Sequence, residues 1–520
     1  MSTIAAHTVS LLRYAPGVVL LAIVIAGAEQ RADPDLWGHL RFGQAVLVQH
    51  HLILNDPYSY SAPGHRWLNH EWLTEIMMAL LYNHLGAAGL KLWKLGCAAA
   101  TVLLVAAGMA ETGAAPSMRL NTLIVAAVAL MPQMQFRPQI FTFSLFAAIL
   151  ALLGRHNYRG GSPLWLAVPL IALWANLHGG FIIGLAALAL YTAVVAIQDL
   201  TGGKGVDRSV YLAILTINAT AATLLTPYGL GTWEAVAHAL RNPLTRNLIT
   251  DWQPLWFALG QQWRAEHLGV IYYLCVIGLM AAMAITFTLR PHGYDLPLVA
   301  IAVLMSAAAF TAVRNMPLAV IACASPVARH ASLIFVGPRR GGAPAAEGKE
   351  AVPERSGVNE WLAAILALVV AVSSGMFRPR IEAGPGYPDG AVSFMRRYAL
   401  QGNLLGAFGW GEYLIWHLAP GSKVFIDGRY DTVFPLRVIR DYAVFYFDLP
   451  GAVQVLSRYP HDFVLIPPDS MACGMMQRTP GWKIIYRDAN SVLFARADSP
   501  AAALSGKPET GGAARQLYFP

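Results

Sequence analysis

Residues 31–75 concentrate chemically capable side chains between two strongly apolar segments. An ionised carboxylate can act as a general base, whereas imidazole and guanidinium groups can hold a hydroxyl or a phosphate. So many polar groups beside apolar segments favour a binding or catalytic site over a simple connection. The candidate groups are Asp33, Asp35, His39, Arg41, His70 and Glu71.

Two short helices are expected to position these groups, and the first begins at Asp33. An Asp followed by Pro34 is typical of a helix N-cap with proline at the first helical position. The helix would run to about Gln49 and would place Asp35 and His39, four residues apart, on one face. Capping alone is the plainer role for Asp33. Because Asp33 fills the cap position, Asp35 needs another explanation and is the stronger candidate base.

The second helix is predicted to begin near Asn69 and to lie in the membrane interface. Trp72 and Ile76 fall on an apolar stripe, while Glu71 and Glu75 share a more polar face. An amphipathic pattern of this kind is typical of interfacial helices. Glu71 is therefore a further candidate carboxylate, with simple exposure at the interface as its plainer alternative.

The composition is that of a polytopic membrane protein. Of 520 residues, 56% are hydrophobic and only 13% are charged, and the mean hydropathy is +0.48. The net charge of +8 is expected to reside mainly in cytoplasmic loops, so nucleic acid is not a predicted partner. The cysteines show no disulfide framework and no metal-binding spacing, and no Walker loop or HExxH motif occurs.

About eleven transmembrane helices are predicted from apolar runs near the length that crosses a bilayer, roughly 20 residues. The first run shows no small-residue cleavage site, so we expect it to be a retained span. The runs are Leu11–Ala28, Leu90–Met109, Leu120–Met134, Ile140–Leu153, Leu164–Leu177, Phe181–Ile197, Val210–Leu225, Val270–Leu289, Leu296–Val313, Pro317–Val336 and Trp361–Met376. The predicted fold class is a polytopic α-helical membrane protein with a soluble C-terminal α/β domain.

Basic loops predict the orientation of these spans, because short loops rich in Lys and Arg stay in the cytoplasm. An N-terminus on the inside places Arg119, Arg155, Arg159, Lys204 and Arg208 in cytoplasmic loops. Each outer polar residue alone is explained as an interfacial anchor or a helix cap, but joint placement at one face favours a site. The residues gathered on the outer side are Arg137, Asn176, His178, Arg246, Asp251 and Arg314.

Changes in composition divide the chain into successive parts. The predicted parts are a transmembrane domain at 1–336 with an outer loop at 31–88, a cytoplasmic linker at 337–357, the last span at 358–376, an outer α/β domain at 377–498 and a disordered tail at 499–520. In the α/β domain we predict a helix at Asp389–Leu400 and strands at 423–427, 462–466, 482–486 and 491–495, the last two forming a hairpin.

One motif of this domain, Asp427-Gly-Arg429, has two interpretations. It follows a predicted strand, at the edge where ligands often bind in α/β sheets. A tight turn with local ion pairs explains the same residues without any ligand.

The order of elements resembles the GT-C superfamily of integral membrane glycosyltransferases. The shared features are a first span, an outer loop that opens with Asp33-Pro-Asp35 on a short helix, and an interfacial helix with Asn69-His-Glu-Trp72. A bundle of spans and an outer C-terminal domain follow. Within the superfamily the chain looks most like the bacterial group related to protein O-mannosyltransferases and aminoarabinose transferases. The architectural resemblance covers about the first 340 residues, and the sequence match is confined to the first outer loop.

The resemblance implies sugar transfer, with inversion, from a polyprenyl-phosphate donor to a glycan, lipid or protein acceptor. The reaction would take place at the outer face of a bacterial inner membrane, with the N-terminus cytoplasmic and the C-terminal domain periplasmic. The family's catalytic aspartate matches Asp33 or Asp35. Many relatives carry two adjacent acids there, whereas a proline separates them here, so both stay candidates. Arg137, Arg314 and one of Arg241 or Arg246 would stabilise the leaving phosphate, and the histidines would hold the acceptor or the phosphate.

Three other functions stay open from the sequence. A transporter or flippase of lipid-linked sugars predicts charged groups near the middle of spans, which the predicted spans nearly lack. A polysaccharide polymerase or ligase would share the donor and the outer site. A non-catalytic assembly protein would use the outer domain for contacts. The sequence identifies no cofactor and leaves a divalent metal ion open.

Overall fold

The computed structural model describes residues 21, 26–27, 30–203, 205–241, 250–265, 269–289, 295–336, 378–506 and 518–520. The chain forms two compact units. Unit 1 comprises Met1–Gln30, Lys91–Gly229 and Arg246–Arg378, and unit 2 comprises Arg31–Leu90, Leu230–Thr245 and Pro379–Pro520. The loop that opens with Asp33 therefore folds together with the C-terminal residues, although the sequence grouped it with the transmembrane domain.

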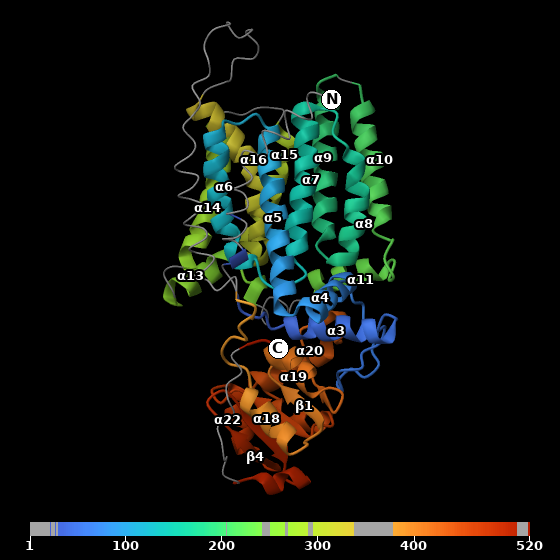
Figure 1. Ribbon diagram of the computed structural model, residues 1–520, viewed down its shortest axis with the longest axis vertical. Coiled ribbons are helices and arrows are strands. Elements are labelled where there is room, and N and C mark those ends of the chain that lie inside the picture. The colour runs from blue at the N-terminus through green and yellow to red at the C-terminus, as the bar shows by residue number, and fades with distance from the viewer. Residues whose placement is uncertain are drawn as a thin grey trace. The chain divides into compact units, whose positions relative to one another are not determined.

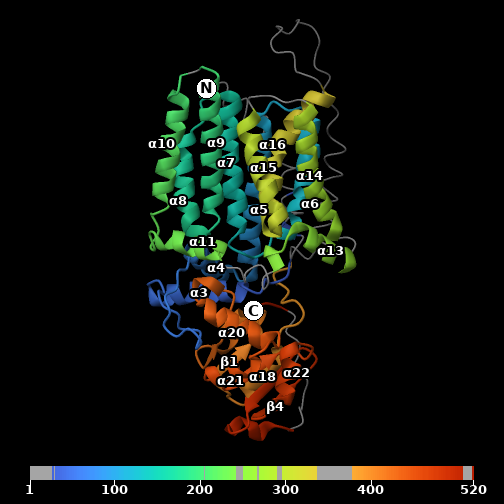
Figure 2. The same ribbon diagram turned by 180° about the vertical axis from the view of Figure 1, so that it is seen from behind.

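Unit 1 consists mainly of long apolar helices that run side by side, as Figure 1 and Figure 2 show from opposite directions. They are α5 (Ala87–Glu111), α6 (Pro116–Leu130), α7 (Ile140–Arg159), α8 (Ala167–Leu177), α9 (Phe181–Thr201), α10 (Asp207–Ala222), α14 (Val270–Leu289), α15 (Leu296–Thr311) and α16 (Met316–Phe335). The short helix α13 (Leu255–Ala265) lies at one end of this group. A helix that is apolar on every face is stable only among other helices or lipid. On α14, for example, Ile271, Leu274 and Ile285 are exposed, which suits contact with lipid.

Five helices of the described chain are long and apolar enough to cross a bilayer, in agreement with the predicted fold class. They are Ala87–Glu111, Ile140–Arg159, Phe181–Thr201, Val270–Leu289 and Val313–Phe335. Shorter apolar helices occupy Leu164–Leu177 and Leu296–Thr311.

The predicted spans that fall within the described residues each coincide with a helix. The first predicted span lies largely outside the described residues, and the last span and the linker at 337–357 lie wholly outside them. The total of about eleven spans therefore stays a prediction.

Unit 2 contains a five-stranded mixed sheet with the strand order β2-β1-β3-β5-β4. The strands are β1 (Gly402–Gly406), β2 (Ser422–Val424), β3 (Phe463–Ile466), β4 (Trp482–Arg487) and β5 (Val492–Arg496). β1 pairs in parallel with β2 and β3, whereas β5 pairs antiparallel with β3 and β4. Every residue of the central strand β3 is buried, as expected for a strand covered on both faces.

The predicted strands of the C-terminal domain are present, including the β4–β5 hairpin, but β1 was not predicted. Its sequence, Gly-Asn-Leu-Leu-Gly, is poor in residues that favour strands. β1 forms because it lies between β2 and β3 and hydrogen bonds to both. Its neighbours in the fold, and not its own propensity, decide its structure.

The described helices of unit 2 come from three separate parts of the chain. They are α3 (Leu36–Gln49), α4 (Trp72–Leu85), α11 (Gly231–Arg241), α18 (Asp389–Arg397), α19 (Gly411–Leu418), α20 (Leu436–Tyr446), α21 (Ala452–Arg458) and α22 (Met471–Arg478). α3 and α18 were predicted, and α4 begins slightly later than its predicted start near Asn69.

Two contacts explain why the loop after Arg31 folds with the C-terminal residues. The backbone between α3 and α4 extends the sheet at β2: the Val424 N–H donates to the Tyr58 carbonyl at 3.0 Å, and the Tyr60 N–H donates to the Val424 carbonyl at 3.2 Å. On α3, the fully buried ring of Trp37 contacts the rings of Tyr387 and Tyr413 at centroid distances of 4.6 and 5.3 Å. Burial of such a cluster contributes on the order of several kcal/mol to holding α3 in unit 2.

Part of the segment that was predicted to be disordered, 499–520, has ordered structure. Pro500–Leu504 form a 3₁₀ helix. Phe519 is buried against Trp37, with ring centroids 5.0 Å apart, and its N–H donates to the Ile381 carbonyl at 2.8 Å. The sequence around Phe519 did not predict this order, because the apolar site for its ring is formed by residues elsewhere in the chain.

Candidate functional site

Asp33 and Asp35 lie just before α3 and have different surroundings. Asp33 Oδ1 accepts a hydrogen bond from the Asp35 backbone N–H at 3.0 Å, so this buried carboxylate stabilises the turn that leads into the helix. Asp35 occupies the N-cap position itself, two residues later than predicted, and its half-buried side chain makes no capping hydrogen bond. A role in capping α3 therefore does not explain why position 35 carries a carboxylate.

Helices α3 and α4 bring an imidazole and two carboxylates together. His39 Nδ1 lies 3.2 Å from Glu75 Oε1 and 3.9 Å from Glu71 Oε2. Asn69 Nδ2 donates to Glu75 Oε2 at 2.6 Å, and Asn69 Oδ1 accepts the Glu71 backbone N–H at 3.1 Å. His70 Nε2 lies 3.9 Å from the other oxygen of Glu71. The predicted residues His39, His70 and Glu71 thus belong to one polar cluster in unit 2.

The carboxylates of this cluster control the charge of His39. Burial by itself lowers the pKa of the imidazole. The hydrogen bond to Glu75 and the charges of Glu71, Glu75 and Asp35 outweigh burial and raise the pKa of His39 to about 9. At neutral pH His39 is therefore a cation between acidic side chains.

The turn after β2 holds a buried arginine between two carboxylates. Asp427 accepts hydrogen bonds from the backbone N–H, Nε and Nη2 of Arg429 at 3.0, 2.8 and 2.7 Å. Arg429 Nη1 donates to Asp56 Oδ1 at 2.7 Å. The Asp427–Arg429 pair is the local ion pair that was predicted for this turn. Because Asp56 lies between α3 and α4, its bond to Arg429 also holds the first loop to the C-terminal residues.

Aromatic rings enclose the same guanidinium. Burial would lower the pKa of Arg429, but Asp427 and Asp56 raise it above its usual value, so the group stays charged. Because its carboxylate partners come from this chain, Arg429 is a structural anchor of unit 2. The rings, with distances from the guanidinium carbon to the centroid, are Trp67 (4.8 Å), Phe42 (5.1 Å), Tyr58 (5.2 Å) and Phe434 (5.9 Å).

A second group of predicted residues meets within unit 1. Arg137 Nη1 donates to Asp251 Oδ2 at 2.5 Å. The guanidinium of Arg314 lies 4.5 Å from the ring centroid of the adjacent Trp252. Arg137, Asp251 and Arg314 therefore lie in one neighbourhood of unit 1, and their placement at the outer face stays a prediction. Arg246 lies outside the described residues.

Asn176 and His178 have local structural contacts at the end of α8. Asn176 Nδ2 donates to the carbonyls of Ala172 and Leu225 at 2.9 and 3.0 Å. His178 occupies the C-cap position, and its Nδ1 accepts the Gly180 N–H at 3.0 Å and lies 2.8 Å from Thr142 Oγ1. These contacts favour the helix-end role for both residues over substrate binding. Arg41 lies half-buried on α3, two residues after His39.

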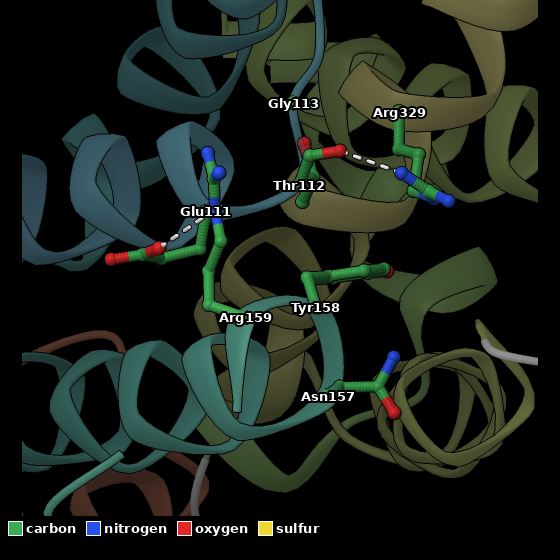
Figure 3. Close-up of a pocket in the computed structure, with 7 residues that line it drawn as sticks. All are labelled: Glu111, Thr112, Gly113, Asn157, Tyr158, Arg159 and Arg329. Atoms are coloured by element: carbon green, nitrogen blue, oxygen red, sulfur yellow. Dashed lines mark hydrogen bonds and ion pairs between the residues drawn. The ribbon is translucent and has the colours of Figure 1, made fainter. Parts of the chain in front are cut away.

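A pocket between the ends of α5, α7 and α16 was not expected from the sequence (Figure 3). Figure 3 shows Arg159 joined to Glu111 and Arg329 joined to Thr112. These are an ion pair of 3.5 Å and a hydrogen bond of 2.6 Å to the Thr112 carbonyl. Arg329 also pairs with Asp295 at 2.9 Å. Both guanidiniums are already paired with other groups of this chain. The pocket is therefore a weak candidate for an anion-binding site, although two arginines line it.

Sequence reasoning missed four polar residues of unit 2. Glu75 could have been selected from the sequence, because it lies one helical turn after Glu71 on the same face. Asp56 and Asn69 were assigned only to a turn and a helix start. Glu412, on α19, is nearly fully buried and has no local sequence pattern that distinguishes it from a surface helix residue.

Comparisons of sequence gave no relatives: no protein-family model matches the chain, and no curated protein is similar to it. Several solved structures have a similar fold, among them the following three. An oligosaccharyltransferase from Archaeoglobus fulgidus in its apo form matches 87% of this chain and 69% of its own, with a TM-score of 0.52 and 12% identity. ArnT from Cupriavidus metallidurans in its apo state matches 97% of this chain and 100% of its own, with a TM-score of 0.50 and 12% identity.

The third structure is the arabinofuranosyltransferase AftD from mycobacteria, with a TM-score of 0.50 and 14% identity. It matches 93% of this chain, which spans only 40% of the AftD chain. All three are GT-C glycosyltransferases, so the predicted GT-C resemblance is confirmed at the level of the fold. At these identities the likeness extends to the fold alone.

Proposed function

We propose that this chain, which has the fold of the GT-C membrane glycosyltransferases, transfers a sugar from a polyprenyl-phosphate donor to an acceptor hydroxyl, with Asp35 as the general base. The observation that carries the proposal is Asp35 itself, a half-buried carboxylate at the start of α3 whose place is not explained by capping. The proposal places the reaction at the outer face of a bacterial inner membrane, with the N-terminus in the cytoplasm. An interfacial site suits a donor that reaches the enzyme by diffusing within the bilayer.

The chemistry assigns a task to each group. Asp35 takes the proton of the acceptor hydroxyl while the acceptor oxygen bonds to the anomeric carbon and the donor phosphate leaves with the bonding electrons. A single displacement of this kind inverts the anomeric configuration. The start of a helix favours an ionised carboxylate, which is the form that a base requires.

The direct test is transfer by the purified full chain in lipid vesicles. The protein is incubated with a panel of radiolabelled polyprenyl-phosphate sugars, and the release of free polyprenyl phosphate is measured. Release that depends on an added acceptor supports the proposal. Acceptors differing in class separate a single-sugar transferase from a polysaccharide polymerase or ligase. Transport of intact donor across the vesicle membrane without cleavage would contradict it.

The arginines of unit 1 are proposed to bind the phosphate that leaves. A guanidinium can form two parallel hydrogen bonds to a phosphate, and an ammonium cannot. We expect Arg137→Lys and Arg314→Lys each to lower kcat for transfer by on the order of tenfold or more, although charge is kept. Arg155→Lys, at a helix end that the proposal places on the cytoplasmic side, is the matched control. Full activity of both variants at normal expression would exclude these arginines from the site.

A divalent metal ion fits the donor atoms of the His39, Glu71 and Glu75 cluster. One ligand atom from each side chain lies within 4.8 Å of the others, and an imidazole with two carboxylates suits several divalent ions. If bound, the ion would supply positive charge that stabilises the phosphate leaving group. Binding requires a neutral His39, so the ion and the imidazole proton compete.

This competition predicts how Mn²⁺ changes thermal stability with pH. The folded-state pKa of His39 is raised to about 9. In chelating buffer its stabilising ion pair is complete below the unfolded-state pKa of about 6.5 and is lost as pH rises through about 9. We therefore expect Mn²⁺ to raise the melting temperature more at pH 9 than at pH 6.5, and not at all in His39→Gln. Equal stabilisation of wild type and His39→Gln would remove this cluster as the metal site.

A further inference from the structure

Glu412 is a carboxyl group that the C-terminal part of the chain places beside Asp35. A Cβ added to Gly428 would lie 2.7 Å from Glu412 Oε1 and closer still to Asp35 Oδ1, so the two carboxyl groups meet over this glycine. On the other side, a Cβ added to Gly38 of α3 would collide with Glu412 Oε2. Glycine at both positions leaves the space through which the Glu412 side chain reaches Asp35.

The surroundings of Glu412 disfavour a negative charge. The residue is 4% exposed, and Oε2 is buried without a hydrogen-bond partner among the described residues. A buried carboxylate with an unsatisfied oxygen is strongly disfavoured, and the uncharged acid is disfavoured much less.

Charged groups on three neighbouring elements act in the same direction. Asp35 faces Glu412 from the start of α3, Asp427 from the turn after β2, and Glu75 from α4. Burial raises the pKa of Glu412 well above its usual value, the charges of Asp35 and Asp427 add to this, and Arg429 offsets only part of it.

Arg429 and His39, two cations near these acids, are already paired with other carboxylates. Arg429 pairs with Asp427 and Asp56. His39 lies 3.2 Å from Glu75. Neither cation is paired with Glu412. These surroundings therefore favour the protonated, uncharged form of Glu412.

We propose that Glu412 is a positioning residue of the transfer site, which stands beside Asp35 as an uncharged carboxylic acid and keeps that base ionised and in place. The inference rests on the proposed function and extends it to a residue more than three hundred positions away in the sequence. It also gives the C-terminal part of the chain a role in the reaction itself.

The step is balanced without any further reactant. The acceptor proton moves to Asp35, the acceptor oxygen bonds to the anomeric carbon, and the phosphate leaves with the bonding electrons. Glu412 keeps its proton throughout. Two adjacent carboxyl groups rarely ionise together, and the proton stays on the one that is more costly to charge. If Glu412 lost its proton at alkaline pH, its negative charge would repel the Asp35 carboxylate and displace the base.

The test compares Glu412→Gln with Glu412→Met in the full chain in lipid vesicles. Glutamine copies the shape and the hydrogen-bonding ability of an uncharged acid, whereas methionine keeps the length without the polar end. We expect Glu412→Gln to keep kcat within about threefold, and Glu412→Met to lose on the order of a hundredfold in kcat with little change in KM, because the base is misplaced. Asp441→Asn, which alters another acid of the C-terminal residues, should leave transfer unchanged.

The pH profile separates this role from a merely structural one. In wild type, activity should fall at alkaline pH as Glu412 loses its proton. In Glu412→Gln this fall should be absent, because an amide stays uncharged. A glutamine variant as inactive as the methionine variant would show that the carboxylate form is required and would overturn the inference. Two fully active variants, or an unchanged alkaline limb in Glu412→Gln, would overturn it as well.

Infrared difference spectroscopy tests Glu412 without any transfer assay. At neutral pH in chelating buffer, wild type minus Glu412→Gln should contain the carbonyl stretch of one protonated carboxyl group. Its absence would overturn the inference even if transfer is observed. Its presence in a protein that transfers no sugar would leave the proton on Glu412 established and would count against the proposed function alone.

Discussion

Asp35→Asn is expected to abolish sugar transfer while the protein still folds and inserts into the membrane. The substitution removes the group that takes the acceptor proton, and loss of a general base typically costs on the order of a hundredfold or more in rate. Asparagine has the same shape as aspartate and remains a good N-cap residue, so the substitution should cost little stability. The measurement is release of polyprenyl phosphate by the purified variant, with its melting temperature as the check on folding.

Asp33→Asn is the matched control, because it changes the other acid of the same turn. Asp33 accepts the Asp35 backbone N–H at 3.0 Å, and an asparagine oxygen can accept the same bond. We expect its activity to stay near that of wild type. An inactive Asp33→Asn beside an active Asp35→Asn would reverse the assignment of the base. Full activity in both variants would contradict the proposed glycosyl transfer by an aspartate in this loop.

Arg429→Met is expected to produce the largest loss of stability. It leaves Asp427 and Asp56 buried without their shared counter-ion, and removal of one partner from a buried ion pair typically costs about 3–5 kcal/mol. For a folded unit of this size, that corresponds to a fall in melting temperature of about 10 °C or more. The fall should appear in thermal unfolding of the full chain in detergent, together with faster proteolysis within residues 378–506.

Arg496→Met provides the comparison for an exposed pair. Arg496 Nη2 lies 2.8 Å from Asp498, but both side chains are at least half exposed, at 50% and 69%. Water screens the attraction within such a pair, so this variant should melt close to wild type. Arg429→Lys should fall between the two, because lysine keeps the charge but loses the forked contacts. An Arg429→Met variant as stable as Arg496→Met would show that Arg429 does not hold the first loop to the C-terminal residues.

Most of the described helices of unit 1 could be predicted from the sequence. Runs of about twenty apolar residues form helices because an unsatisfied backbone group is costly in lipid, and this rule depends on local composition alone. The same local logic located the turn at Asp33, the helix after it and the β4–β5 hairpin. It identified both acids of this turn as candidates, but the N-cap position that it assigned to Asp33 is occupied by Asp35.

Tertiary structure decided which distant residues share the site. Neither β1 nor the buried place of Phe519 follows from its own segment, because both depend on partners elsewhere in the chain. Glu412 stands beside Asp35 because two glycines, Gly38 and Gly428, leave the space between α3 and the turn after β2. Whether a carboxyl group is charged depends on burial and on neighbouring charges. The sequence therefore determined which residues could act as acids and bases, and only the folded chain determined which of them stands next to which.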